Sequence, residues 1–95
     1  MEYKEVYTFR NKEINNIYKL FYNTYYNQQD FRGLSQELPQ SDTKTAFEKL
    51  GQKYTYKWTA KNKMNLEIGY DGGVTTISFE QHDKNAIATM TYNAD

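Results

Sequence analysis

Few side chains in this sequence are of the types that usually carry enzyme chemistry. His82 is the only histidine, and it lies in the polar segment QHDKN, where a turn with an exposed side chain is expected. Ser35, Ser41 and Ser78 lack the surrounding GxSxG pattern that presents a nucleophilic serine, and one histidine cannot activate all three. We therefore expect no catalytic residue and predict that the protein is not an enzyme.

Two carboxylates invite comparison with an acid–base pair. Glu67 and Glu80 fall on the polar face of two neighbouring predicted strands. General acid–base catalysis needs a site that perturbs the pKa of such groups, and an open sheet face offers little desolvation. We instead interpret these charges as cross-strand ion pairs, with Lys57 opposite Glu67 and Lys53 opposite Asp71.

Sequence patterns that bind phosphate or metal are also lacking. The DGG segment at 71–73 joins two predicted antiparallel strands and opens no helix, so it lacks the helix N-terminus of a phosphate loop. Asp71 with Glu67 or Asp83 does not follow the ligand spacing of a calcium loop. The absence of cysteine excludes disulfides and zinc sites built on thiolates. We therefore expect no cofactor and no metal.

Aromatic side chains are the one compositional excess: ten Tyr, five Phe and one Trp exceed what the core of so small a domain requires. Tyr22 and Tyr26 lie toward one flank of the predicted helix's apolar stripe, and Leu20 lies on the opposite flank. Tyrosine gives a large contact area and a hydrogen bond at low entropic cost, which suits recognition. The alternative is that both rings merely pack against the 30–40 loop. With the threonine-rich sheet face included, the candidate partner-binding residues are Leu20, Tyr22, Tyr26, Thr76, Ser78 and Thr89.

The 53–63 segment carries four lysines, no acid and three interleaved aromatic residues. This composition is typical of surfaces that stack single-stranded bases on aromatic rings. Strand alternation, however, places Tyr54, Tyr56 and Trp58 on one face and Lys57 on the other. Acidic residues on the neighbouring strands would also repel phosphates. Single-stranded nucleic-acid binding through this segment is therefore the second hypothesis.

Helical and strand periods indicate which elements carry these side chains. Residues 2–10 alternate, which predicts a first strand, and Asn11 can cap a helix that runs to about residue 29. Residues 41–51 predict a second, short helix, with Ser41 or Asp42 as its cap and Gly51 as its stop. The side chains expected to point inward are Ile14, Ile17, Tyr18, Phe21 and Tyr25 in the long helix, Phe31, Leu34 and Leu38 in the following loop, and Ala46, Phe47 and Leu50 in the short helix.

Alternation of period two predicts an antiparallel meander over residues 52–92. Asp71-Gly72 suits a two-residue hairpin turn, because such pairs tolerate the positive φ angles that the turn demands. A three-residue loop at 61–63 and a turn at Asp83-Lys84 join the other strands. Across the turn at Asp71-Gly72 we expect Leu66 to face Ile77. Across the 61–63 loop we expect Trp58 to face Leu66 and Tyr56 to face Ile68. Across the turn at Asp83-Lys84 we expect Ala88 to face Phe79 and Met90 to face Ile77.

A chain of 95 residues without a linker or repeat fits a single domain, residues 1–95. We predict an α+β fold of two layers: a four- to five-stranded antiparallel sheet, with the C-terminal meander as its main part and one long and one short helix packed on one face.

Zero net charge argues against a generally basic nucleic-acid binder. No segment approaches the ~20 apolar residues of a membrane helix, and the polar start MEYKEVYTFR lacks the apolar centre of a signal peptide. We therefore expect no membrane association and a cytoplasmic location, or an extracellular one if a signal segment has been removed.

These features favour a small protein-binding module or inhibitor, which would occlude the working surface of a partner protein of unknown identity. The abundance of Lys, Asn, Tyr and Ile indicates AT-rich coding, and the chain resembles small inhibitors and accessory factors of phages and mobile elements. The order of helix and meander with YTYKW and TTISFE, over residues 41–92, also resembles small extracytoplasmic lipoprotein modules and β-lactamase-inhibitor-like domains. That resemblance implies ligand or protein binding outside the cytoplasm. An unpaired sheet edge could also join two copies of the chain in a homodimer.

Overall fold

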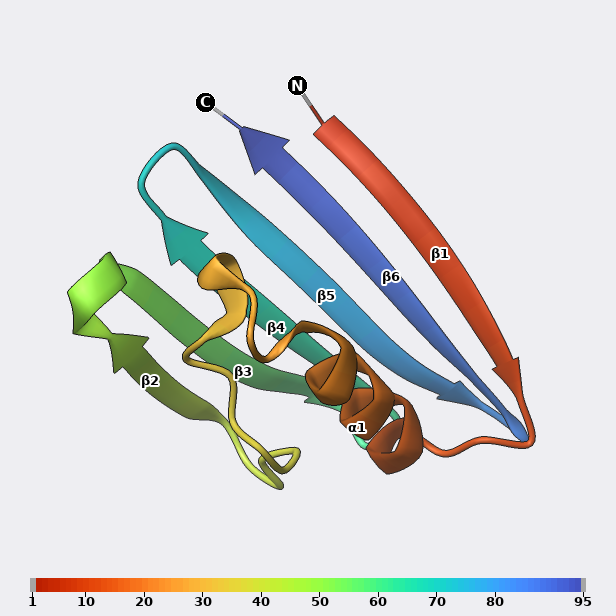
Figure 1. Ribbon diagram of the computed structural model, residues 1–95. Coiled ribbons are helices and arrows are strands. Elements are labelled where there is room, and N and C mark those ends of the chain that lie inside the picture. The colour runs from red at the N-terminus through yellow and green to blue at the C-terminus, as the bar shows by residue number, and fades with distance from the viewer. Residues whose placement is uncertain (1, 95) are drawn as a thin grey trace.

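The computed structural model describes residues 2–94, which form one helical layer on a six-stranded antiparallel sheet (Figure 1). The strands lie in the order β1-β6-β5-β4-β3-β2. The α+β class is confirmed, whereas the expected four or five strands are too few. In chain order the elements are β1 (Glu2–Arg10), α1 (Ile14–Tyr25), the 3₁₀ turn η1 (Gln29–Phe31), β2 (Thr43–Phe47), the 3₁₀ turn η2 (Glu48–Leu50), β3 (Gln52–Ala60), β4 (Lys63–Tyr70), β5 (Gly73–His82) and β6 (Asn85–Ala94).

β1 pairs with the last strand, β6, so that the two ends of the described chain lie side by side (Figure 1). Tyr7 lies opposite Ala88, and Phe9 lies opposite the buried Ala86. Since partners across an antiparallel pair share a face, the odd-numbered residues of β1 belong to the face that carries α1. The alternation of residues 2–10 predicted this strand, and its place in the sheet comes from the pairing with β6.

Two of the three meander turns have the expected register. Leu66 lies opposite Ile77 across a turn in which Gly72 takes a φ of 88°, a conformation that glycine adopts without steric cost. Met90 also lies opposite Ile77, on the other side of β5. Asp83, in the turn between β5 and β6, has a φ of 52°. Alternation and local turn chemistry therefore predicted these two pairings correctly.

The hairpin of β3 and β4 differs from the expected register by two residues. Trp58 lies opposite Met64 rather than Leu66, because the turn contains only Lys61 and Asn62, and a bulge between Trp58 and Ala60 takes up the remaining residue. The bulge keeps the alternation of β3 in phase with that of β4, so that the apolar face remains continuous.

The same shift removes both predicted cross-strand ion pairs. Lys57 lies opposite Asn65, and Lys53 lies opposite Gly69. Glu67 instead faces threonines on both neighbouring strands. The prediction of these pairs was wrong because each depended on the length of a single turn.

The predicted short helix over residues 41–51 is also wrong. Thr43–Phe47 forms β2, which pairs antiparallel with β3, and the η2 turn then ends at Gly51 with a φ of 63°. Two threonines at alternate positions favour an extended backbone, and pairing gives β2 hydrogen-bond partners along the otherwise free edge of β3. Of the three side chains expected to point inward, Phe47 and Leu50 are half-buried and Ala46 is exposed.

α1 begins later than the sequence suggested. Asn11, the predicted cap, lies in the β1–α1 turn with a φ of 56°, and Glu13 is the N-cap, its backbone N–H donating to Asn16 Oδ1 at 3.1 Å. The helix ends at Tyr25, short of its predicted end near residue 29, and η1 begins only at Gln29. Over the described residues, no helix combines the length and the apolar composition needed to cross a membrane.

The core lies between α1, the loop that follows it and one face of the sheet. Ile17 and Tyr18 of α1 are 2% and 1% exposed, and Leu34 and Leu38 of the loop are buried as predicted. The sheet contributes Tyr54, Tyr56, Met64, Leu66, Ile68, Ile77, Phe79 and Ala86.

Buried tyrosine hydroxyls hold the irregular 30–40 loop against the sheet. The Tyr18 hydroxyl donates to the Ser35 carbonyl at 2.6 Å, and the Tyr56 hydroxyl accepts the Ser35 N–H at 2.9 Å. The Tyr54 hydroxyl accepts the Gly33 N–H at 3.0 Å. These bonds supply partners for backbone groups that lie outside regular secondary structure.

Candidate partner-binding surfaces

α1 leaves an apolar groove along its Leu20 flank, above β6 and β1. The helix packs mainly on β5 and β6, so that Tyr7 and Phe9 of β1 form the outer wall of the groove. Its volume is about 230 Å³. Leu20 on the helix and Tyr7 on β1 stand at its rim, 48% and 44% exposed. The lining residues are Tyr7, Phe9, Ile17, Leu20, Phe21, Thr24, Tyr25, Ile77, Phe79, Ala88 and Met90.

Tyr22 and Tyr26 lie on the other flank of α1. Their rings are stacked, with centroids 5.2 Å apart and planes inclined by 17°. Tyr26 is 48% exposed, whereas Tyr22 is half-buried and packs against the core. The structure therefore separates Leu20, which lines the groove, from the tyrosine pair, which does not.

The face of the sheet opposite α1 carries the other three sequence candidates. Ser78 lies opposite Thr89, and Thr76 lies opposite Thr91, so that short hydroxyl side chains occupy the middle of this face. The three candidates Thr76, Ser78 and Thr89 therefore lie together on two adjacent strands. They cannot join one contact area with Leu20, Tyr22 and Tyr26, because the sheet lies between the two groups.

Basic side chains gather on this open face although the chain as a whole is neutral. Strand parity assigns six basic and two acidic residues to it among those whose side chains the structure describes. One group of lysines lies on β2, β3 and β4, and the other bases lie on β1. The bases are Lys4, Arg10, Lys44, Lys53, Lys57 and Lys63, and the acids are Glu67 and Glu80.

The aromatic residues interleaved with the lysines of β3 point into the core. Tyr54 and Tyr56 are fully buried, and Trp58 is half-buried with its indole N–H donating to the Pro39 carbonyl at 2.9 Å. Burial raises the pKa of the Tyr18 and Tyr54 hydroxyls above the ordinary value of 10.0. These hydroxyls stay neutral and act as hydrogen-bonding groups.

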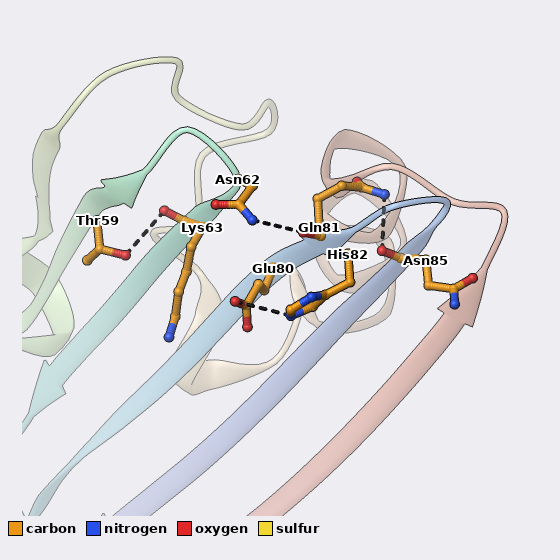
Figure 2. Close-up of polar contacts among 7 residues, drawn as sticks. All are labelled: Thr59, Asn62, Lys63, Glu80, Gln81, His82 and Asn85. Atoms are coloured by element: carbon orange, nitrogen blue, oxygen red, sulfur yellow. Dashed lines mark hydrogen bonds and ion pairs between the residues drawn. The ribbon is translucent and has the colours of Figure 1, made fainter.

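A polar cluster surrounds the end of β5, where the sequence placed its only histidine (Figure 2). Gln81 is its centre: the side-chain oxygen accepts the N–H of Ile14, and the amide nitrogen donates to the carbonyls of Lys12 and Asn85, each at 3.0 to 3.1 Å. Gln81 therefore ties the start of α1 to the sheet. We therefore interpret Gln81 as a structural residue that fixes the position of α1 on the sheet.

His82 points away from Gln81, onto the open face. Its Nε2 lies 3.2 Å from Glu80 Oε2, and the two side chains are 57% and 32% exposed (Figure 2). Such exposure leaves the pair hydrated, so the attraction between the two side chains is weak. Within the part of the chain that the structure describes, no three acidic or histidine side chains come together in a way that could hold a metal ion.

Comparison with protein families, with curated proteins and with solved structures gave no match for this chain. The groove itself was missed in the sequence, because it depends on β1 lying beside β6. The alternation of Tyr3, Tyr7 and Phe9 was visible, yet nothing in the sequence told which strand β1 would join.

Proposed function

We propose that this protein is a non-enzymatic protein-binding module that inhibits or occludes a partner protein by docking on it. The observation that supports the proposal is the apolar groove between α1, β6 and β1, with Leu20 and Tyr7 exposed at its rim. Exposed apolar side chains around a partly desolvated depression are the usual anchors of protein interfaces.

The size and shape of the groove favour a protein partner over a small molecule. Sites for small ligands usually enclose ~300–1,000 Å³ and bury most of the ligand. The groove has about 230 Å³ and is open along one side, so it can accept apolar side chains that project from a larger surface. The small volume and the open side of the groove also favour protein binding over the extracytoplasmic ligand-binding alternative.

The test is affinity capture from the source organism with wild type and two matched variants, with bound proteins quantified by mass spectrometry. Leu20→Lys places a charge at the groove rim, and Lys57→Ala alters the opposite face. A genuine partner should bind Leu20→Lys ~5- to 30-fold more weakly, because losing an interface anchor costs ~1–2 kcal/mol. The Lys57→Ala variant should bind the same partner as tightly as wild type does.

Tyr26→Ala extends the test to the other flank of α1. The ring is exposed and stacked on Tyr22, so its removal should weaken binding several-fold only if the partner reaches across the helix. Capture that is unchanged by Leu20→Lys and Tyr26→Ala alike would contradict the proposal for this side of the molecule.

A second candidate, nucleic-acid or other polyanion binding, is supported by the excess of six bases over two acids among the open-face residues whose side chains the structure describes. Binding there would use charge, because the rings of Tyr54 and Tyr56 are buried and cannot stack on bases. It predicts that Lys57→Ala weakens binding of a single-stranded oligonucleotide and that affinity falls steeply as salt rises. Binding that is independent of salt would contradict this candidate.

A further inference from the structure

β1 is a long sheet edge with exposed apolar side chains. It ends the strand order, so the edge away from β6 has no partner strand within the described chain. Tyr3, Val6 and Tyr7 are 59%, 58% and 44% exposed, and they make up half of the six large apolar side chains that stand exposed in the described structure. Val6 points to the open face, whereas the two tyrosines point to the face of α1. Such an edge is a template for strand addition.

A second copy of the same chain can add to this edge only in a few registers. In a two-fold symmetric antiparallel pair that continues the sheet, a residue must face one of the same parity, because facing residues share a face. Each allowed register is therefore centred on one residue of β1, which meets itself in the other copy.

Charge disfavours the other registers that are centred on the middle of β1. Centring on Glu5 would bring two glutamates face to face, and centring on Tyr7 would bring Lys4 opposite Arg10. Centring on Lys4 would pair two lysines. Like charges directly opposite each other destabilise a strand pair. Centring on Val6 avoids every such clash and is the only register that pairs the whole of β1, Glu2–Arg10.

The Val6-centred register is also chemically complementary. Val6 would bury its exposed side chain against Val6 of the second copy, and Lys4 would face Thr8. Glu5, which already accepts a hydrogen bond from the Tyr7 hydroxyl of its own chain, would lie opposite the second copy's Tyr7. Arg10 would face residue 2, a glutamate in the sequence.

We propose that two copies of this chain form a symmetric dimer by antiparallel pairing of β1 about Val6, which makes one continuous sheet. α1 does not obstruct this edge, because it packs mainly on β5 and β6, and β1 lies beyond β6 in the sheet. On the face of α1, Tyr3 of the second copy would stand beside Phe9 and extend the outer wall of the groove. The dimer is independent of the proposed function, since it uses the edge of β1 and leaves the groove open.

Engineered cysteines test both the dimer and its register, because the wild-type chain has none. Val6→Cys should form an intermolecular disulfide under mild oxidation, since facing residues have Cα atoms ~4.5–5.5 Å apart, within the range that a disulfide spans. Thr8→Cys, on the same face of the same strand, should not, because the two copies of residue 8 would be offset by four residues, about 14 Å.

A mixture makes the register test stricter. Lys4→Cys and Thr8→Cys should each fail to cross-link alone and should cross-link when mixed, because residue 4 faces residue 8. A disulfide that forms readily with Thr8→Cys alone, or with none of the variants, would overturn the proposal.

Sedimentation equilibrium measures dimer formation independently of any cross-link. Wild type should show a concentration-dependent dimer, and Val6→Lys, which places two lysines on the symmetry axis, should raise the dimer dissociation constant about tenfold or more. Circular dichroism checks that Val6→Lys is folded, which its exposed position favours. A wild type that stays monomeric at every attainable concentration would refute the dimer.

Discussion

Gly33→Ala should destabilise the fold strongly, although it adds only one methyl group. A Cβ at this position would lie 2.3 Å from Cε1 of Tyr54, whereas unstrained carbon contacts are ~3.5–4.0 Å. The loop and the ring must therefore separate by more than ~1 Å. The ring cannot move freely, because Tyr54 is fully buried and its hydroxyl accepts the Gly33 N–H and bonds to the Asp30 carbonyl at 3.1 Å.

The expected loss combines two effects. Overpacking a well-filled core costs ~1–3 kcal/mol, and each hydrogen bond lost when the loop moves costs a further ~0.5–1.5 kcal/mol. We expect a loss of about 3 kcal/mol in the free energy of unfolding, which corresponds to a fall in Tm of more than ~10 °C for a domain of this size.

Gly69→Ala is the matched control. Gly69 lies within β4, and an added Cβ would have no atom within 4 Å, so alanine should be neutral or should stabilise the strand by up to ~1 kcal/mol. Urea unfolding followed by far-UV circular dichroism and by Trp58 fluorescence measures both variants. Trp58 also reports on the loop, since its indole N–H bonds to the Pro39 carbonyl. If Gly33→Ala is no less stable than Gly69→Ala, the packing of the 30–40 loop on Tyr54 is refuted.

Three further predictions follow from the geometry. Gln81→Ala should cost ~1–3 kcal/mol in stability and speed hydrogen exchange of the Ile14 amide, because the side-chain bonds of Gln81 to the Ile14 N–H and the Lys12 carbonyl are lost; exchange unchanged at Ile14 would contradict this. The raised pKa of Tyr18 keeps its hydroxyl neutral in the folded state while the unfolded state ionises near 10.0, so the contribution of Tyr18 to stability should be intact below pH 10 and fall as pH rises above it. Urea unfolding of wild type and Tyr18→Phe below and above pH 10 measures this, and the variant should lose less stability over that range. Asp83→Val should destabilise by ~1–2 kcal/mol because a branched side chain is strained at a φ of 52°, and Asp83→Gly should be nearly neutral in thermal unfolding; equal effects of the two would count against a strained turn.

The hairpin between β4 and β5 could be predicted from the sequence because its determinants are local. Alternating side chains decide which residues share a face, and Gly72 supplies the positive φ that the turn uses. The long helix was predicted for the same kind of reason, since an apolar stripe at helical spacing needs only a surface on which to pack.

The predictions that were wrong concerned elements whose conformation or register is decided by pairing with a neighbouring strand, and the pattern within a single segment does not specify that pairing. Residues 41–51 contain both a short helical pattern and alternating threonines, and the free edge of β3 favoured the strand because it offered hydrogen-bond partners. The register of β3 on β4 depends on a bulge after Trp58, which no sequence pattern predicted.

The candidate surfaces depended even more on tertiary structure. The tyrosine flank of α1 follows from helical geometry, so sequence reasoning could name Tyr22 and Tyr26. The groove and the basic open face required β1 to join β6 and β2 to join β3, which brought Tyr7 beside Leu20 and gathered lysines from separate strands. Short-range propensities determine which residues can share a face of one element, but only the assembly of the sheet, driven by burial of its apolar face, decides which elements become neighbours.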